Sequence, residues 1–174
     1  MKLRFLAFFA AAFLFSCGKI PDVRGFFPKE TSGGGDSTFH TASNNSEIAG
    51  IALRARDTFP LFLHHLRRPG IGERDFRVKY PFPADDGSGF LREHLWLGDI
   101  RRGEESYTGV VLNIPFYVSG LSKGDRTAFN TGEITDWMYI RKGKIIGGRS
   151  IKYLLEQIPA AERNAEEQAV LDMF

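Results

Sequence analysis

The sequence predicts an α+β domain in which an N-terminal amphipathic helix packs on a curved antiparallel sheet or a partly open small barrel, with C-terminal helices. Three observations carry this prediction. Apolar residues recur at helical spacing over residues 46–68, several short segments with a period of two follow from residue 73, and residues 151–174 return to a helical pattern. With 174 residues and one cysteine, the chain can bury a core and cannot form an internal disulfide.

The first 16 residues contain the three parts of a secretory signal. Lys2 and Arg4 give a basic start, the stretch 5–15 is apolar, and Ser16 precedes the only cysteine. A helix over this apolar stretch would rise about 16 Å, which is short of the roughly 30 Å hydrocarbon core of a bilayer. We therefore expect residues 1–16 to be removed as a signal peptide.

Leu14, Ser16, Cys17 and Gly18 resemble the lipobox of bacterial lipoproteins. The resemblance implies a diacylglycerol on the sulfur of Cys17 and a further acyl chain, such as palmitate, on its amine, so that the membrane is a partner through these chains. Gly18 in place of Asp favours the periplasmic face of the outer membrane if the host is Gram-negative. The alternative is an ordinary signal peptide whose end happens to include a cysteine of the buried type.

Residues 17–45 are rich in Gly, Ser, Thr, Asn and Pro and show no apolar periodicity. This composition predicts a lipid-anchored flexible tether with a root-mean-square span of about 30 Å. Removal of residues 1–16 takes two basic residues from 23 and no acidic residue, which leaves 21 basic against 21 acidic side chains. A neutral chain in the cell envelope is not expected to bind nucleic acid.

The folded domain is predicted to span residues 46–174. Ser46 is suited to cap a helix, and an apolar stripe follows it at Ile48, Ile51, Ala52, Ala55, Phe59, Phe62, Leu63 and Leu66. Pro60 lies within this stripe, where it removes a backbone hydrogen bond, so we expect a kink or two shorter helices. Pro69 and Gly70 end the helical pattern.

The apolar period changes to two beyond residue 72. Phe76, Val78, Tyr80 and Phe82 alternate with polar residues, which predicts a strand with one solvent-facing side. Further strands are expected at residues 90–98, 107–114, 126–130, 137–141 and 144–147, with hairpin turns at 84–89 and 142–143. Residues 151–158 and 159–174 are expected to form one or two helices.

Several short motifs resemble a bacterial family of unknown function, DUF2314, also called the YegJ-like family. They occur in the order Phe76–Lys79, Glu93–Leu97, Gly109 with Asn113–Pro115, Lys123–Asp125, Ile134–Met138 and Gly147–Gly148. The resemblance covers residues 49–162, and it implies the boundary of the domain. Where the family has an aromatic residue and Thr after the double glycine, this chain has Arg149 and Ser150. The family has no established reaction, cofactor or ligand.

Glu93, His94 and Trp96 are candidate ligand-binding residues on one predicted strand. Because side chains alternate along a strand, Glu93 shares a face with Leu95, whereas His94 shares the other face with Trp96. In one interpretation Glu93 accepts hydrogen bonds from an arginine or from backbone amides, and His94 stacks on Trp96. In the other, Glu93 lines a cleft and acts as a general base.

Asp136 and Trp137 are the other candidate ligand-binding residues. An aspartate in front of a strand is suited to accept from exposed backbone amides, and a tryptophan offers a large apolar face with one donor. The alternative is that the pair recognises a polar ligand such as a sugar or a peptide.

The motifs of metalloproteases, serine hydrolases, phosphate-binding loops and dinucleotide-binding folds are absent from the sequence, and the four histidines lack metal-ligand spacing. No cofactor or metal is therefore predicted. We predict a non-enzymatic, lipid-anchored module of the cell envelope that binds an unknown envelope protein or a small polar ligand. The alternative is an envelope hydrolase with Glu93 or Asp136 as general base, which requires these two carboxylates to converge in one pocket.

Overall fold

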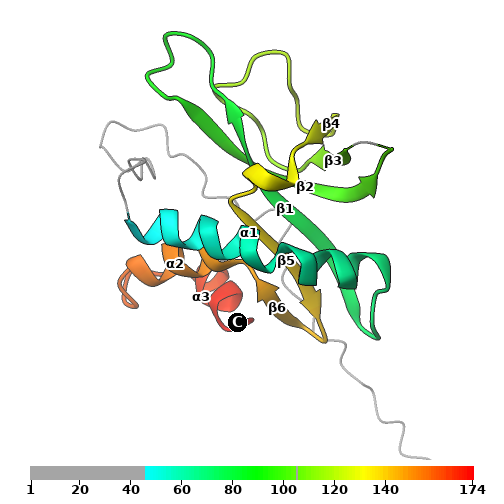
Figure 1. Ribbon diagram of the computed structural model, residues 1–174. Helices are drawn as coiled ribbons and strands as arrows, with labels where there is room; N and C mark the ends of the chain where they lie inside the picture. The colour runs from blue at the N-terminus through cyan, green and yellow to red at the C-terminus, as the bar shows by residue number, and fades with distance from the viewer. Residues whose placement is uncertain (1–45, 105) are drawn as a thin grey trace, which may run out of the picture.

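The structure is a computed structural model, which describes residues 46–104 and 106–174 (Figure 1). The predicted signal peptide at 1–16, the lipidation site Cys17 and the predicted tether at 17–45 lie outside the described residues. The described part contains a long helix, a six-stranded sheet and two short C-terminal helices. The predicted α+β fold is thereby confirmed.

Helix α1 spans Ser46–Arg67 as one element of 22 residues. Its buried side chains are Ile51, Ala55, Phe59 and Phe62, all members of the predicted stripe. The expectation of two shorter helices is wrong, because Pro60 lies inside a single continuous helix. Pro60 is exposed, so the backbone carbonyl that loses its partner lies on the solvent side, where water can satisfy it.

The sheet is antiparallel throughout and has the order β4-β3-β2-β1-β5-β6. Its strands are β1 (Glu73–Pro83), β2 (Arg92–Arg102), β3 (Tyr107–Val111), β4 (Arg126–Phe129), β5 (Asp136–Arg141) and β6 (Lys144–Gly147). A short 3-10 helix, η1 (Thr131–Glu133), connects β4 to β5. Helices α2 (Arg149–Gln157) and α3 (Ala165–Leu171) follow β6.

The strands occur where the sequence predicts them, with shifts at several of their ends; β2, for example, runs to Arg102 and was expected to end at residue 98. Residues 90–91 and 112–114 were expected to extend strands, but they belong to loops. The segment after β3 still contacts β2, because the amide of Trp96 donates to the side chain of Asn113 at 2.9 Å and the amide of Leu112 donates to the carbonyl of Trp96 at 2.9 Å. A side-chain acceptor therefore replaces a backbone acceptor at this point.

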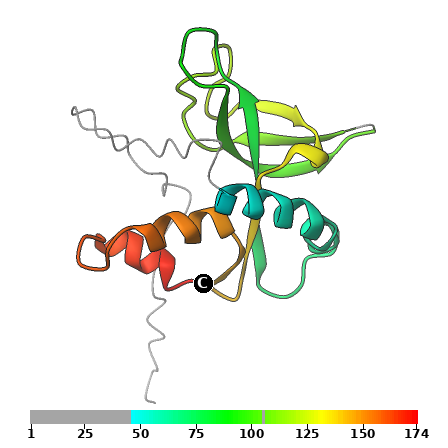
Figure 2. The same ribbon diagram turned by 60° about the vertical axis from the view of Figure 1, so that its left-hand side comes forward.

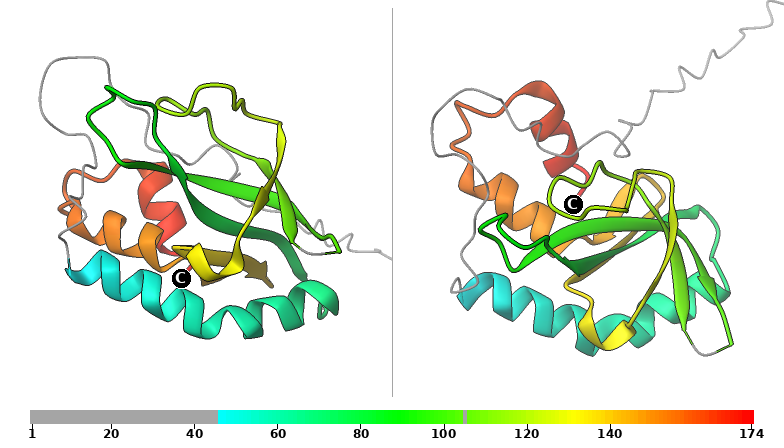
Figure 3. Two further views of the ribbon diagram at one scale, coloured as in Figure 1. Left: turned by 45° about the horizontal axis from the view of Figure 1, so that its top comes forward. Right: turned by 90° about the horizontal axis from the view of Figure 1, so that it is seen from above.

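Each face of the sheet is covered by helices (Figure 3). Helix α1 covers one face, where Phe59 and Phe62 share a core with Val78, Leu95 and Trp137. Helices α2 and α3 cover the other face, in a second core formed by Trp96, Met138, Ile140, Ile145, Leu155, Val170 and Met173. We call these the α1 face and the α2–α3 face.

The second face corrects one sequence prediction. Strand β1 was expected to have a solvent-facing side, but Arg77 on that side is only 4% exposed and Lys79 is partly buried. The strand alternates as predicted, yet its polar side is covered because α2 and α3 return to pack there. Alternation alone shows that one side is polar and does not show that it is wet.

Strands β2, β3 and β4 curl away from the helices, so that the sheet is curved and open, as the first of the two predicted alternatives has it (Figure 2). The curl brings Phe129 of β4 to Tyr80 of β1, with ring centroids 6.0 Å apart. The register between β2 and β3 shifts between Gly98 and Arg101, where Asp99 has a φ of 44°. A bulge of this kind bends a strand and increases its twist.

Candidate functional site

The sheet register brings several polar side chains together on the α2–α3 face. Lys79 in the middle of β1 pairs with Trp96 of β2 on one side and with Asp136 of β5 on the other. Residues paired across antiparallel strands point to the same face. We call the resulting group the Lys79 cluster, and it consists of Lys79, His94, Trp96, Thr135, Asp136 and Ser150.

Asp136 is the buried centre of this cluster and is 1% exposed. One carboxylate oxygen accepts from the amide of Trp137 at 2.8 Å, and the other accepts from the amide of Ser150 at 2.7 Å. Ser150 lies in the first turn of α2, so Asp136 satisfies a backbone donor that the helix itself leaves free. Desolvation raises the pKa of Asp136, and the hydrogen bonds from Ser150 and the charge of Lys79 oppose that shift.

Lys79 links the buried carboxylate to the surface. Its ammonium donates to the hydroxyl of Ser150 at 3.4 Å and lies 5.8 Å from the ring centroid of Trp96, at the distance of a cation–π contact. Burial lowers the pKa of Lys79, and the charge of Asp136 opposes this shift. The two groups therefore stabilise each other's charged form in a place where burial disfavours both.

His94 lies at the exposed rim of the cluster. Its Nδ1 is 3.1 Å from the hydroxyl of Thr135, whose amide donates to the carbonyl of Lys79 at 2.9 Å. The pKa of His94 is lowered to about 4, first by desolvation of the ring and then by the positive charges of Lys79 and Arg92. His94 is therefore neutral at physiological pH, in a positive local field.

Glu93 points to the opposite face from His94, as alternation predicts. Its carboxylate accepts from the amide of Phe116 at 2.9 Å and from the amide of Tyr117 at 2.8 Å. It therefore holds the loop between β3 and β4 against the start of β2. This contact agrees with the interpretation of Glu93 as an acceptor for backbone amides.

Trp137 is 4% exposed and lies on the α1 face, opposite to its neighbour Asp136. Its indole N–H donates to the carbonyl of Ala55 at 3.0 Å and to the hydroxyl of Thr58 at 3.1 Å, both on α1. The side chain thus fixes α1 on the sheet. In this position Trp137 does not present a face to a ligand.

The structure therefore brings together His94, Trp96 and Asp136 of the predicted site residues, and it separates them from Glu93 and Trp137. Glu93 pairs with Phe82, whereas Asp136 pairs with Lys79, three residues earlier in β1. Because Phe82 and Lys79 point to opposite faces, the two carboxylates do not converge in one pocket. The hydrolase alternative loses the geometry that it requires.

Three members of the cluster, Lys79, Thr135 and Ser150, are absent from the sequence prediction. Lys79 was assigned to a solvent-facing side, and the other two carry ordinary hydroxyl groups. The useful signal was the pairing of β1 with β5, which sets Lys79 opposite Asp136. That pairing joins strands about 57 residues apart in the chain, and local patterns do not specify it.

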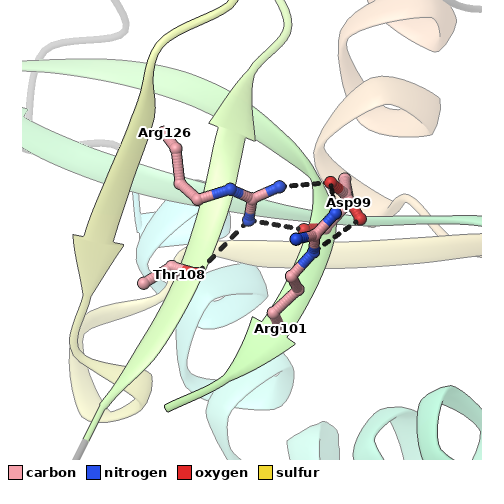
Figure 4. A network of polar contacts seen from close by, with 4 residues as sticks. All are labelled: Asp99, Arg101, Thr108 and Arg126. Carbon is pink, nitrogen blue, oxygen red and sulfur yellow. Dashed lines mark hydrogen bonds and ion pairs between the residues drawn. The ribbon is translucent and has the colours of Figure 1, made fainter.

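A second polar network lies on the curled part of the sheet (Figure 4). Asp99 forms ion pairs with Arg101 and with Arg126, and Arg126 also donates to the carbonyl of Asp99 at 3.0 Å and to the hydroxyl of Thr108 at 3.2 Å. Arg126 thus reaches from β4 across β3 to the bulge in β2. Because the Asp99 side chain is 52% exposed, the network is a brace at the surface rather than an enclosed site.

Within residues 46–104 and 106–174, His, Asp and Glu side chains do not gather in groups of three that could hold a metal ion. In the same part of the chain, none of the helices has the length and apolar character needed to cross a membrane.

Comparison with known proteins identifies the family. A family model described as "Uncharacterized protein conserved in bacteria (DUF2314)" matches residues 45–173. The chain belongs to the DUF2314 family. The match covers the whole described fold, so the Lys79 cluster and both cores lie inside the family domain.

Two curated relatives are similar to this DUF2314 chain. A protein of Neisseria meningitidis serogroup B named as an ankyrin repeat protein (NMB1133/NMB1171) is 32% identical over 140 residues, which cover 78% of this chain and 55% of the relative. The Escherichia coli K12 protein named "Uncharacterized protein YegJ" is 37% identical over 87 residues, which cover 50% of this chain and 54% of the relative. The chain thus spans about half the length of these relatives. No solved structure matches it significantly.

The double glycine of the DUF2314 motif lies beside the Lys79 cluster. Gly147 and Gly148 have φ values of 82° and 63°, a region that favours glycine. A Cβ on Gly147 would collide with the backbone carbonyl oxygen of Trp137. The two glycines thus turn the chain sharply from β6 into α2 and place Ser150 on Asp136.

Proposed function

We propose that this DUF2314 protein is a lipid-anchored module of the bacterial cell envelope that binds an anionic group without catalysing a reaction. The anionic group belongs to a small polar ligand or to an acidic side chain of a partner protein. The binding residues are His94, Lys79 and Arg92 at the rim of the Lys79 cluster. Cys17 carries the lipid in this proposal.

The observation that carries the proposal is the positive field at the exposed rim of the cluster. Arg92 is exposed and donates to the carbonyl of Pro81, the residue paired with His94, at 3.3 Å. The pKa of His94 is lowered first by desolvation and further by the positive charges of Lys79 and Arg92. The one carboxylate in the cluster, Asp136, is buried and already accepts two backbone amides. An anion at this rim would therefore meet two cations and a neutral imidazole that can donate a hydrogen bond.

The non-enzymatic part of the proposal follows from the two candidate bases. Glu93 is held by two amides of the β3–β4 loop, and Asp136 is buried on the opposite face. A general base must be within hydrogen-bond reach of the proton that it removes, and it must be accessible to substrate. Asp136 is closed to substrate by burial, and both oxygens of Glu93 are already occupied by backbone amides.

The lipid anchor is supported by the signal-like residues 1–16 and the lipobox-like residues that end at Gly18. A compact domain on an acylated tether is suited to holding a ligand near the membrane.

Nuclear magnetic resonance of the His94 ring tests the proposal with inorganic phosphate as the probe. We expect the ring signals of His94 to shift saturably as phosphate is added near neutral pH, and the pKa of His94 to rise because a bound anion stabilises the charged imidazole. Arg92→Gln should weaken this response severalfold, since it removes one of the two cations that face the anion.

Lys123 provides the matched control, because it is an exposed cation on the β3–β4 loop, outside the cluster. The Lys123→Gln variant should respond to phosphate as the original chain does. The proposal fails if the His94 shift equals that of the exposed His64, or if it is unchanged in the Arg92→Gln variant.

A further inference from the structure

Three large apolar side chains are exposed together at one end of the sheet. Leu91 is 85% exposed, Ile114 is 63% exposed and Phe116 is 60% exposed. Leu91 precedes β2, and the other two residues lie in the loop between β3 and β4. We call these three residues the apolar tip.

The two loops that carry the apolar tip are joined by hydrogen bonds. The amide of Asp85 donates to the carbonyl of Tyr117 at 2.7 Å, and the Asp85 carboxylate accepts from the amide and the hydroxyl of Ser119, both at 2.8 Å. Beneath the tip, the rings of Phe90 and Tyr117 pack with centroids 4.6 Å apart. The tip is therefore a fixed arrangement of side chains.

The same contacts satisfy the backbone of the loop. Glu93 accepts from the amides of Phe116 and Tyr117, and Asp85 accepts from the amide of Ser119. A backbone donor that leaves water without a partner costs several kcal/mol in hydrocarbon, so loops rarely enter lipid unless their polar groups are paired. This loop meets that condition at three of the four residues from Phe116 to Ser119.

The position of the apolar tip indicates what covers it. The β1–β2 loop and the first turn of α1 both lie on the left of Figure 1 and of both views in Figure 3, and Figure 2 shows the loop well above that turn. The chain enters the described domain at that first turn, at Ser46. Because the predicted tether has a span of about 30 Å, a lipid on Cys17 would keep the apolar tip within reach of the membrane.

The size of the apolar tip also favours lipid over a folded partner. A stable protein–protein interface buries roughly 800 Å² on each side, and three side chains at the end of two loops supply only part of such an area. Shallow, reversible insertion into the headgroup region needs only a few apolar side chains, because its strength scales with the apolar area that is buried.

We propose that Leu91, Ile114 and Phe116 insert into the surface of the lipid bilayer and orient the domain on the membrane. The direction from which the membrane approaches rests on the proposed lipid anchor. Asp85 is engaged by Ser119, Asp86 is exposed beside it, and the exposed cation Arg92 directly follows Leu91. Because charges of both signs lie beside the tip, the apolar side chains drive the insertion, and attraction to anionic lipid adds little.

Tryptophan fluorescence tests this proposal in the full-length mature chain that carries Cys17→Ser and therefore has no acyl group. A Phe116→Trp variant keeps the backbone N–H that donates to Glu93. The native Trp96 and Trp137 are each 4% exposed, so their emission is a constant background. We expect vesicles of phosphatidylethanolamine with brominated acyl chains to shift the emission of Phe116→Trp to shorter wavelength and to quench it saturably. Adding phosphatidylglycerol should change this result little.

Leu53→Trp is the matched control, because Leu53 is an exposed apolar residue on α1, 56% accessible and away from the tip. Its emission should not respond to the vesicles. Leu91→Ser in the Phe116→Trp background should weaken the apparent binding severalfold. These expectations do not depend on acylation of Cys17 or on anion binding, so they can hold or fail separately from the proposed function.

Two results would overturn the proposal. In the first, Phe116→Trp and Leu53→Trp respond equally to the vesicles, which would indicate non-specific adsorption. In the second, Phe116→Trp does not respond to the vesicles; a shift as the protein itself is concentrated would then identify the tip as a contact between two copies of the chain.

Discussion

Asp136 and Trp137 are neighbours in sequence, but they serve opposite faces of the sheet. Asp136 accepts from the first turn of α2, and Trp137 donates to the backbone of α1. The residue types already indicated an amide acceptor and a large apolar side chain with one donor. Their separate faces follow from alternation, but the partners became visible only when α1 and α2 were placed on the sheet.

The lowered pKa of His94 determines the direction in which the stability of the folded chain changes with pH. Its pKa is lowered to about 4 in the folded chain, from an ordinary value of 6.5. Between these two pKa values the unfolded chain binds more protons than the folded chain. The contribution of neutral His94 to the free energy of unfolding is therefore fully present above pH 6.5 and is lost as the pH falls toward 4.

We therefore predict that wild type loses more stability between pH 6.5 and 4 than His94→Gln does. Urea denaturation at a series of pH values measures this difference. Because His94 is exposed, solvent screens part of the effect, and the direction of the difference is the prediction. His64→Gln, on the exposed side of α1, should keep the wild-type profile. Parallel curves for wild type and His94→Gln would contradict the assignment of a neutral His94.

At the scale of elements, the sequence located every strand and every α-helix within the described residues, because the periods of two and 3.6 are local properties. It predicted the break in α1 wrongly, since Pro60 occupies the exposed side of a helix whose buried side remains intact. It also extended β3 by three residues, because side-chain bonding by Asn113 is not visible in an apolar pattern.

The curl of the sheet depends on the close approach of β3 to β2 at Gly109. A Cβ at this position would lie 2.8 Å from the Cβ of Leu97 and 2.9 Å from the Cδ1 of Ile100, both in the core. Gly109→Ala should therefore lower the free energy of unfolding by about 1–3 kcal/mol through overpacking.

Gly50→Ala is the control for this prediction, because Gly50 lies in α1 and only the flexible side chain of Arg54 is near its added Cβ. That substitution should raise stability by about 0.5–1 kcal/mol, since alanine favours a helix more than glycine does. Chemical denaturation measures both variants. A Gly109→Ala variant as stable as wild type would show that the two strands separate without cost.

At the scale of the whole molecule, one antiparallel sheet is covered by helices on both faces and curls at one end. The sequence predicted the helix on the first face, but not that α2 and α3 would enclose the polar side of β1. Enclosure depends on contacts between distant segments, such as the second core that joins Trp96 to Val170. The Lys79 cluster lies at the edge of this enclosure and is assembled by the same contacts between distant segments. The sequence therefore predicted only three of its six members.

Glu93 and Asp136 support the fold, whereas the proposed binding residues lie at the rim of the Lys79 cluster. Both oxygens of each carboxylate accept from backbone amides. In Glu93→Gln or Asp136→Asn, the side-chain oxygen can still accept from one backbone amide. The new NH₂ group faces the other backbone N–H, and because both are donors that hydrogen bond is lost.

The most direct test is the free energy of unfolding of Glu93→Gln and Asp136→Asn, measured by chemical denaturation of the purified chain. Each variant should lose about 1–3 kcal/mol. The control Glu156→Gln, whose exposed carboxylate is 4.0 Å from Lys152, should stay within about 0.5 kcal/mol of wild type. Unchanged or increased stability in both Glu93→Gln and Asp136→Asn would contradict the account, because it would identify these carboxylates as functional groups held at the expense of the fold.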